Sequence, residues 1–150
     1  MKELIIHSIN IEGKNYFDFN IHADKLNIKE IPSNSLIKIK GSIENISLRF
    51  FVKCDIDFKL KLQCSRCLDY FETNFHEHTE VLYEKINNTN NNEEEPIEDS
   101  FTYEYRGNNI NLTQMVYDTI LLNKPMKPLC NPDCKGIKIK NRNINLNLTL

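Results

Sequence analysis

Residues 50 to 64 read FFVKCDIDFKLKLQC, and this stretch decides the fold. Apolar side chains occupy every second position from Phe50 to Cys64, and most positions between them carry lysine or aspartate. A repeat of two over this length is typical of a β-strand with one buried face. Cys54 falls on the apolar side of the repeat, so we expect its thiol to lie in the core as a small hydrophobic group.

Weaker alternation flanks this strand on both sides. Residues 37–43 show it directly upstream, and Glu44 and Asn45 supply a plausible turn, so the two runs are expected to form an antiparallel hairpin. Further strands are predicted in residues 17–21, 71–83 and 101–105. The spacing predicts an α+β fold, mainly antiparallel β, built as a curled or two-layer sheet with one C-terminal helix and a cysteine-rich loop.

The single helix is predicted after residue 110. Asn111 is a suitable N-cap, with Gln114 three residues later as in a capping box, and Pro125 is expected to end the helix. Four apolar residues at helical spacing form its buried face: Leu112, Met115, Val116 and Ile120.

Charge is distributed unevenly along what we expect to be a single domain of residues 1–150. Residues 87–99 contain five acids and no base, which predicts a flexible acidic surface loop. Residues 124–150 form a basic tail, in which the segment 124–142 has six basic residues and one acid. The formal net charge of −2 for the whole chain therefore hides a basic C-terminal region.

Nothing in the sequence is typical of secretion or of a membrane span. The N-terminal apolar run is interrupted by His7, Ser8 and Asn10, and no segment approaches the roughly 20 apolar residues that cross a bilayer. We therefore expect a cytoplasmic protein with no membrane partner. In that reducing compartment the five cysteines are expected to be thiols or metal ligands.

Two cysteine pairs carry the distinctive chemistry. Cys64-Ser-Arg-Cys67 follows the long strand, and Cys130-Asn-Pro-Asp-Cys134 follows the helix. Two tight turns of this kind can together supply four thiolates to one structural Zn²⁺ ion. Two alternatives stay open: buried or incidental thiols, and a redox site, although a redox pair is expected at a helix N-terminus and this one follows a strand.

Other residue types give little support for catalysis. His76 and His78 share one polar strand face, where they are either surface side chains or a joint metal site. There is no Ser/His/Asp constellation or paired-carboxylate signature, and four glycines leave little material for a phosphate-binding loop. We predict a binding or assembly factor that is not an enzyme and has no small-molecule substrate.

Three elements in order resemble the YceD family of large ribosomal RNA subunit accumulation proteins. They are Leu62-Gln-Cys-Ser-Arg-Cys-Leu68, the helix from Asn111 to Leu-Leu-Asn-Lys-Pro125, and Leu129-Cys-Asn-Pro-Asp-Cys-Lys-Gly136, and the resemblance spans residues from about 36 to 147. Many members carry two further cysteines after the last element, where this chain has Lys138 and Asn141. Four cysteines outside the core remain, enough for one four-thiolate ion.

The resemblance implies a non-enzymatic role in 23S rRNA accumulation or processing and in assembly of the large ribosomal subunit. The expected partner is precursor 23S rRNA, a large-subunit assembly intermediate or a ribosomal protein. One hypothesis is a zinc-stabilised platform that presents basic side chains to RNA, namely Arg66, Lys135, Lys138, Lys140 and Arg142. The alternative is a protein-interaction module in which the basic tail is incidental, and a thiol redox protein is a remote third.

Overall fold

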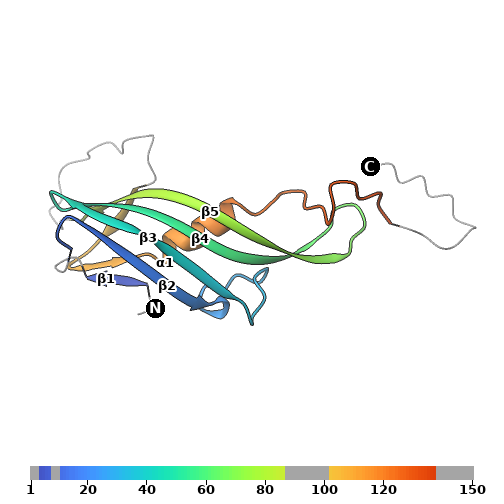
Figure 1. Cartoon of the computed structure of the whole chain (residues 1–150), viewed down its shortest axis with the longest axis horizontal. Helices are drawn as coiled ribbons and strands as arrows, with labels where there is room; N and C mark the ends of the chain where they lie inside the picture. Colours follow the sequence, from blue (N-terminus) through green and yellow to red (C-terminus); the bar gives the residue numbers. More distant parts are fainter. Residues whose placement is uncertain (1–3, 8–10, 87–101, 138–150) are drawn as a thin grey trace, which may run out of the picture.

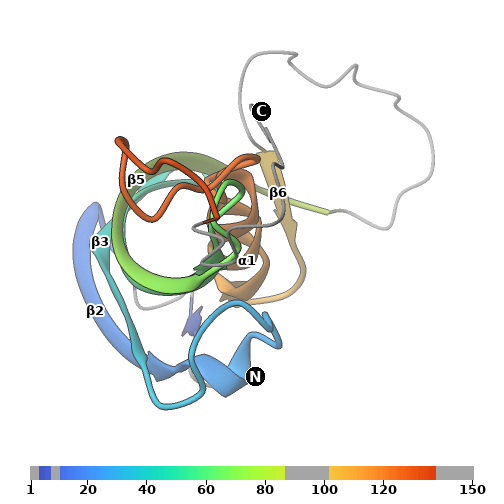
Figure 2. The same cartoon turned by 90° about the vertical axis from the view of Figure 1, so that its right-hand side faces the viewer.

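The computed structural model describes residues 4–7, 11–86 and 102–137. A five-stranded sheet in the order β2-β3-β4-β5-β6 curls around one helix, α1 (Figures 1 and 2). The predicted fold class is confirmed. The elements are β2 (Lys14–His22), β3 (Leu36–Ile46), β4 (Arg49–Gln63), β5 (Tyr70–Lys85), β6 (Thr102–Tyr105) and α1 (Thr113–Leu122), with a short 3-10 turn η2 (Ala23–Lys25).

Strand β4 supplies the middle of the core, as its alternation predicted. Its inward side chains are buried over the whole length of the strand, while Lys53 and Lys61 between them are exposed and Lys59 is half-buried. The buried set is Phe50, Val52, Cys54, Ile56, Phe58, Leu60 and Leu62. β4 pairs antiparallel with β3 on one side and with β5 on the other, so burial on one face fixes the register of three strands at once.

The β3–β4 turn lies further along the chain than predicted. Glu44 and Asn45 remain in β3, and the two-residue turn is made by Ser47 and Leu48, with φ values of 52° and 66°. Positive φ at both positions is what a type I′ hairpin turn requires. The Asn45 side chain contributes by accepting a hydrogen bond from the Leu48 N–H at 3.1 Å.

Helix α1 buries the predicted face, with Leu112, Met115, Val116 and Ile120 all in the core. The predicted capping box is wrong, because the N-cap residue is Leu112 and not Asn111, and the cap has no side-chain hydrogen bond. The Asn111 side chain accepts from the Thr113 N–H at 2.9 Å, but Gln114 donates to Asp118 one turn later instead of reaching back to the cap. The helix ends at Leu122, three residues before Pro125.

Two strand pairings were not predicted, one of them parallel and one antiparallel. β6 runs parallel to β5, and the short strands β1 (Ile5–His7) and β7 (Asn109–Asn111) form a separate two-stranded sheet. The predicted acidic loop at 87–99 lies outside the described residues. In the part of the chain that the structure describes, no helix is long and apolar enough to cross a membrane.

The hairpin of β4 and β5 projects beyond the rest of the sheet. β3 pairs with β4 only as far as Asp57, whereas the β4–β5 pairing continues to Gln63 and Tyr70. The tip of this hairpin lies beside the chain segment that follows α1 (Figure 1). This arrangement brings residues about 65 positions apart in the sequence to one place.

Candidate metal centre

Four cysteines converge at the hairpin tip, and we call them the cysteine centre: Cys64, Cys67, Cys130 and Cys134. Their four Sγ atoms all lie within 4.8 Å of one another. Across the two segments, Cys64 Sγ lies 3.7 Å from Cys134 Sγ, and Cys67 Sγ lies 3.6 Å from Cys130 Sγ. The predicted pairing of the two motifs is therefore realised in space.

These distances fit a tetrahedral thiolate site. Four sulfur ligands about 2.3 Å from a zinc ion lie about 3.8 Å from one another when the geometry is tetrahedral. The two cross-segment distances of 3.7 and 3.6 Å are close to that value. The group is compatible with a closed structural metal site, and an all-thiolate ligand set favours zinc over the harder cations.

A tight backbone turn positions the thiols of Cys64 and Cys67. The chain turns back after β4 because the Leu68 N–H donates to the Cys64 carbonyl at 3.0 Å, with Leu68 in the left-handed region at φ 65°. The Cys64 N–H donates to the Asp69 carbonyl at 2.8 Å, which closes the loop at the start of β5. Cys64 and Cys67 therefore project from one tight turn.

The second pair is held by a turn of its own. The Cys134 N–H donates to the Asn131 carbonyl at 2.9 Å, and the Asn131 side chain accepts from the Asp133 N–H at 3.0 Å. Two further hydrogen bonds join the turns to each other. The Ser65 N–H donates to the Pro128 carbonyl at 2.7 Å, and Arg66 Nη1 donates to the Cys134 carbonyl at 3.0 Å.

The thiols have unequal proton affinities. Backbone N–H groups, chiefly those of Cys130 and Cys67, stabilise the thiolate and lower the pKa of Cys64 to about 6. The pKa of Cys130 is raised to about 12, mainly because its thiol is hydrogen-bonded with Cys67. One thiolate forms readily while a neighbour keeps its proton, and ionising all four in so small a space requires a cation to offset their charge.

A comparison with known protein families matches the region that contains the four cysteines. The family profile described as "Large ribosomal RNA subunit accumulation protein YceD" matches residues 52–147, which is 96 of the 150 residues. The chain belongs to the YceD family. Searches of curated proteins and of solved structures found no match.

Membership of the YceD family supports a role in accumulation of large-subunit ribosomal RNA. The matched region contains all four members of the cysteine centre and the whole of α1. It begins at Val52, later than the start near residue 36 that the motifs suggested. Lys138 and Asn141, which stand where many YceD proteins have cysteines, lie outside the described residues.

Cys54 is separate from the cysteine centre, as its strand parity predicted. Its side chain is fully buried, and burial raises the pKa of this thiol to about 12. Ten residues of extended strand separate it from Cys64, a distance of roughly 33 Å. Cys54 is a core residue.

The predicted RNA-binding residues are only partly described. Arg66 lies beside the cysteine centre and donates a hydrogen bond to the Cys134 carbonyl. Lys135 is the residue directly after Cys134. Lys138, Lys140 and Arg142 lie outside the described residues. A hollow of about 620 Å³ at this end is lined by Lys135 but also by Asp69 and Asp133, so its charge is mixed. Lys124, at the start of the tail, forms an ion pair with Glu30.

Proposed function

We propose that this YceD protein is a non-enzymatic factor that supports 23S rRNA accumulation and assembly of the large ribosomal subunit by binding precursor rRNA. One Zn²⁺ held by the cysteine centre joins the hairpin tip to the segment after α1. The joined surface presents basic side chains to phosphate: Arg66, Lys135, Lys138, Lys140 and Arg142.

The convergence of the four sulfurs is the observation that carries the proposal. Without a connection at this point, the segment that carries Lys135 would be tied to the hairpin tip mainly by the Ser65–Pro128 and Arg66–Cys134 hydrogen bonds. A structural zinc ion contributes folding free energy directly. The ion would therefore fix the position of the segment that carries Lys135 relative to the β4–β5 hairpin.

Arg66, at the edge of the cysteine centre, is suited to bind a phosphate group. One guanidinium nitrogen is occupied by the Cys134 carbonyl. The guanidinium group has further N–H donors in a planar fork, which suits a phosphate oxygen. Lys135 is the third of the six basic residues in segment 124–142. Among the described residues, no carboxylate lies within ion-pair distance of its ammonium group.

A second candidate function is protein interaction without RNA contact. Leu122, the last residue of α1, and Met126, four residues later, have 69% and 99% of their surface exposed. Exposed side chains of this size are more typical of a protein contact than of a phosphate contact. In this reading the basic tail does not touch RNA.

Changing Lys135, Lys138, Lys140 and Arg142 together to glutamine should separate the two functions. Phosphate contacts release counterions, so losing four of them weakens binding to precursor 23S rRNA and reduces the slope of log affinity against log salt by up to about 3. Filter binding across a salt series measures both quantities. Stability should change little, because exposed charges contribute little to folding.

A matched control keeps the charge change constant and moves it elsewhere. Lys38, Lys40, Lys59 and Lys61 lie on the outer face of the sheet, and their change to glutamine should leave the affinity near that of the wild type. The ratio of 23S to 16S rRNA in cells should fall only with the tail variant. Equal RNA binding by both variants and the wild type, with a normal ratio, would reject the RNA-contact mechanism and favour protein interaction.

A further inference from the structure

A second group of metal-binding side chains lies on the outer face of the sheet, away from the cysteine centre. Strand register sets His76 of β5 opposite Asp57 of β4, and His78 opposite Asp55. Glu80 follows on the same face of β5. We call these five residues the histidine cluster. His76 is six residues from the start of β5 at Tyr70, roughly 20 Å along the strand.

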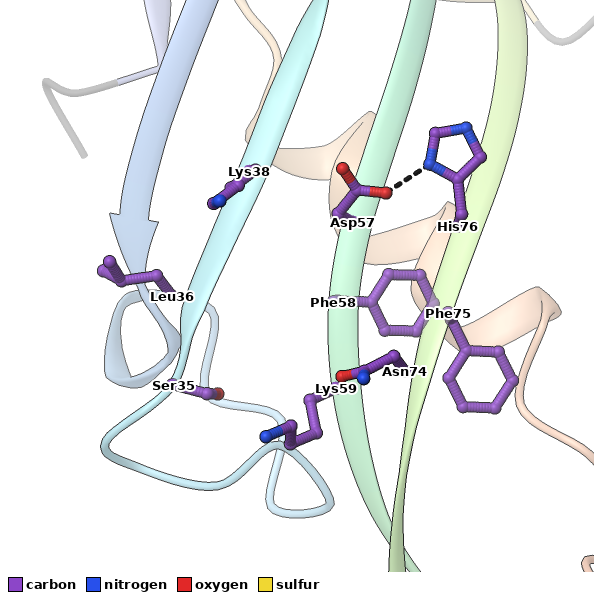
Figure 3. A pocket seen from close by; sticks show the side chains of 9 residues that line it. All are labelled: Ser35, Leu36, Lys38, Asp57, Phe58, Lys59, Asn74, Phe75 and His76. Carbon is purple, nitrogen blue, oxygen red and sulfur yellow. Dashed lines mark hydrogen bonds and ion pairs between the residues drawn. The ribbon is translucent and has the colours of Figure 1, made fainter.

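The two imidazole rings converge on one carboxylate oxygen. His78 Nδ1 lies 2.9 Å from Asp55 Oδ1, and His76 Nε2 lies 3.8 Å from the same atom. The second nitrogen of each ring is held by a different carboxylate. His76 Nδ1 is hydrogen-bonded to Asp57, as Figure 3 shows, and His78 Nε2 lies 3.2 Å from Glu80 Oε1.

This pattern is the one that metal-binding histidines adopt. A ligating imidazole usually has its other nitrogen held by a carboxylate, which orients the ring and raises its basicity. Ligand atoms about 2.1 Å from a zinc ion lie roughly 3.0 to 3.5 Å apart. The observed separations of 2.9 and 3.8 Å lie just either side of that range. Among the described residues, the cysteine centre is the group whose ligand atoms already lie within 4.8 Å of one another, so the two imidazole rings must rotate before both can bind one ion.

Access to solvent also favours a cation here, while the charge around the cluster is close to balanced. Three carboxylates gather around the two rings, and three lysines lie near them: Lys53 approaches Glu80 at 4.0 Å, and Lys38 and Lys40 of β3 stand opposite Asp57 and Asp55. The side chains of His76 and His78 are 67% and 51% exposed. Hollows of about 440 and 470 Å³ adjoin the cluster, the first beside His76 and Asp57 (Figure 3) and the second beside His78 and Asp55. Water can therefore fill the remaining coordination positions.

We propose that His76, His78 and Asp55 bind one divalent first-row transition-metal ion, such as Zn²⁺ or Co²⁺, with Asp57 and Glu80 orienting the rings. Imidazole nitrogen with carboxylate oxygen suits this class of ion. The site has three protein ligands and is open to solvent, so it binds more weakly than the cysteine centre and fills only when metal is added. It is independent of the function proposed for the cysteine centre.

Titration with Co²⁺ tests the site on full-length protein that has first been given one equivalent of Zn²⁺ and dialysed. Asp57 raises the pKa of His76 and Asp55 raises that of His78, and a protonated ring does not bind metal, so the titration is made at pH 8. Equilibrium dialysis of the wild type should give about one Co²⁺ per chain. The absorption of this Co²⁺ should lack the thiolate charge-transfer bands that a cysteine-bound ion would produce.

Three variants assign the ion. His76→Gln with His78→Gln should abolish this Co²⁺ equivalent, and Asp55→Asn should weaken it at least about tenfold. His22→Gln, on the exposed side of β2, should bind as the wild type does. Circular dichroism checks that every variant is folded. No histidine-dependent Co²⁺ in the wild type, retention in the double variant, or equal loss in His22→Gln would overturn the proposal, whatever the cysteine centre binds.

Discussion

Serine at both Cys130 and Cys134 should reduce the zinc retained after dialysis from about one ion per chain to nearly none. The substitution removes two of the four sulfurs and every ligand from the segment after α1, while Cys64 and Cys67 remain at the hairpin tip. Two thiolates on one turn cannot close a tetrahedral site. Elemental analysis of anaerobically prepared protein measures the loss.

The same variant should free the segment after α1 without unfolding the sheet. The core of β4 and α1 is buried independently of the cysteine centre, so the far-ultraviolet spectrum should be unchanged. Residues 123–137 should become readily cleaved in limited proteolysis, because only a few hydrogen bonds and the Lys124–Glu30 pair then hold them.

Cys54→Ala is the matched control for these cysteine substitutions. It also removes a thiol, but from the buried face of β4, and it should keep a full zinc equivalent and resist cleavage as the wild type does. Loss of the ion from the Cys54 variant alone, or full retention in the Cys130/Cys134 variant, would show that the ligand assignment is wrong.

Alanine at Gly41 should destabilise the fold by about 3 kcal/mol. A Cβ atom at this position would lie 2.0 Å from the Lys53 carbonyl oxygen and 2.9 Å from the Cys54 Cα. Both are backbone atoms of β4, the central strand, which is itself held by β5 on its other side. The clash cannot be relieved by rotating a side chain, so the β3–β4 pairing must open.

Urea unfolding measures this loss against Gly13→Ala. Gly13, unlike Gly41, has a positive φ of 65°, but no atom lies within 4 Å of a Cβ added there. Its substitution should cost only the strain of the left-handed conformation, about 1 kcal/mol. If the two variants were equally stable, the close approach of β3 to Lys53 would not constrain the sheet.

An element could be predicted from the sequence where burial of one face imposes a regular spacing of apolar residues. β4 and the inner face of α1 were predictable because every second or every third to fourth residue must enter the core. The β3–β4 turn was missed because Ser47 and Leu48 adopt positive φ without the glycine or asparagine that normally marks such a turn. The parallel β5–β6 pair was missed because local periodicity carries no information on strand direction.

For the functional sites, the local features were predictable from the sequence and the contacts between distant segments were not. The turn-forming spacing within each cysteine pair was visible, but bringing Cys64 to Cys134 depends on the length of the β4–β5 hairpin and on the course of the chain after α1. His76 and His78 were placed on one polar face by parity alone. Their convergence on Asp55 follows from the β4–β5 register, which is set by a turn whose length the sequence pattern did not fix.

Metal content of the wild-type protein, purified anaerobically without added metal and dialysed, is the most direct test of the cysteine centre. We expect about one zinc per chain, four thiols protected from alkylation until a strong chelator is added, and an unfolding transition that chelation lowers. Metal-free protein with all four of these thiols reactive, and with thermal unfolding unchanged by chelator, would contradict the account.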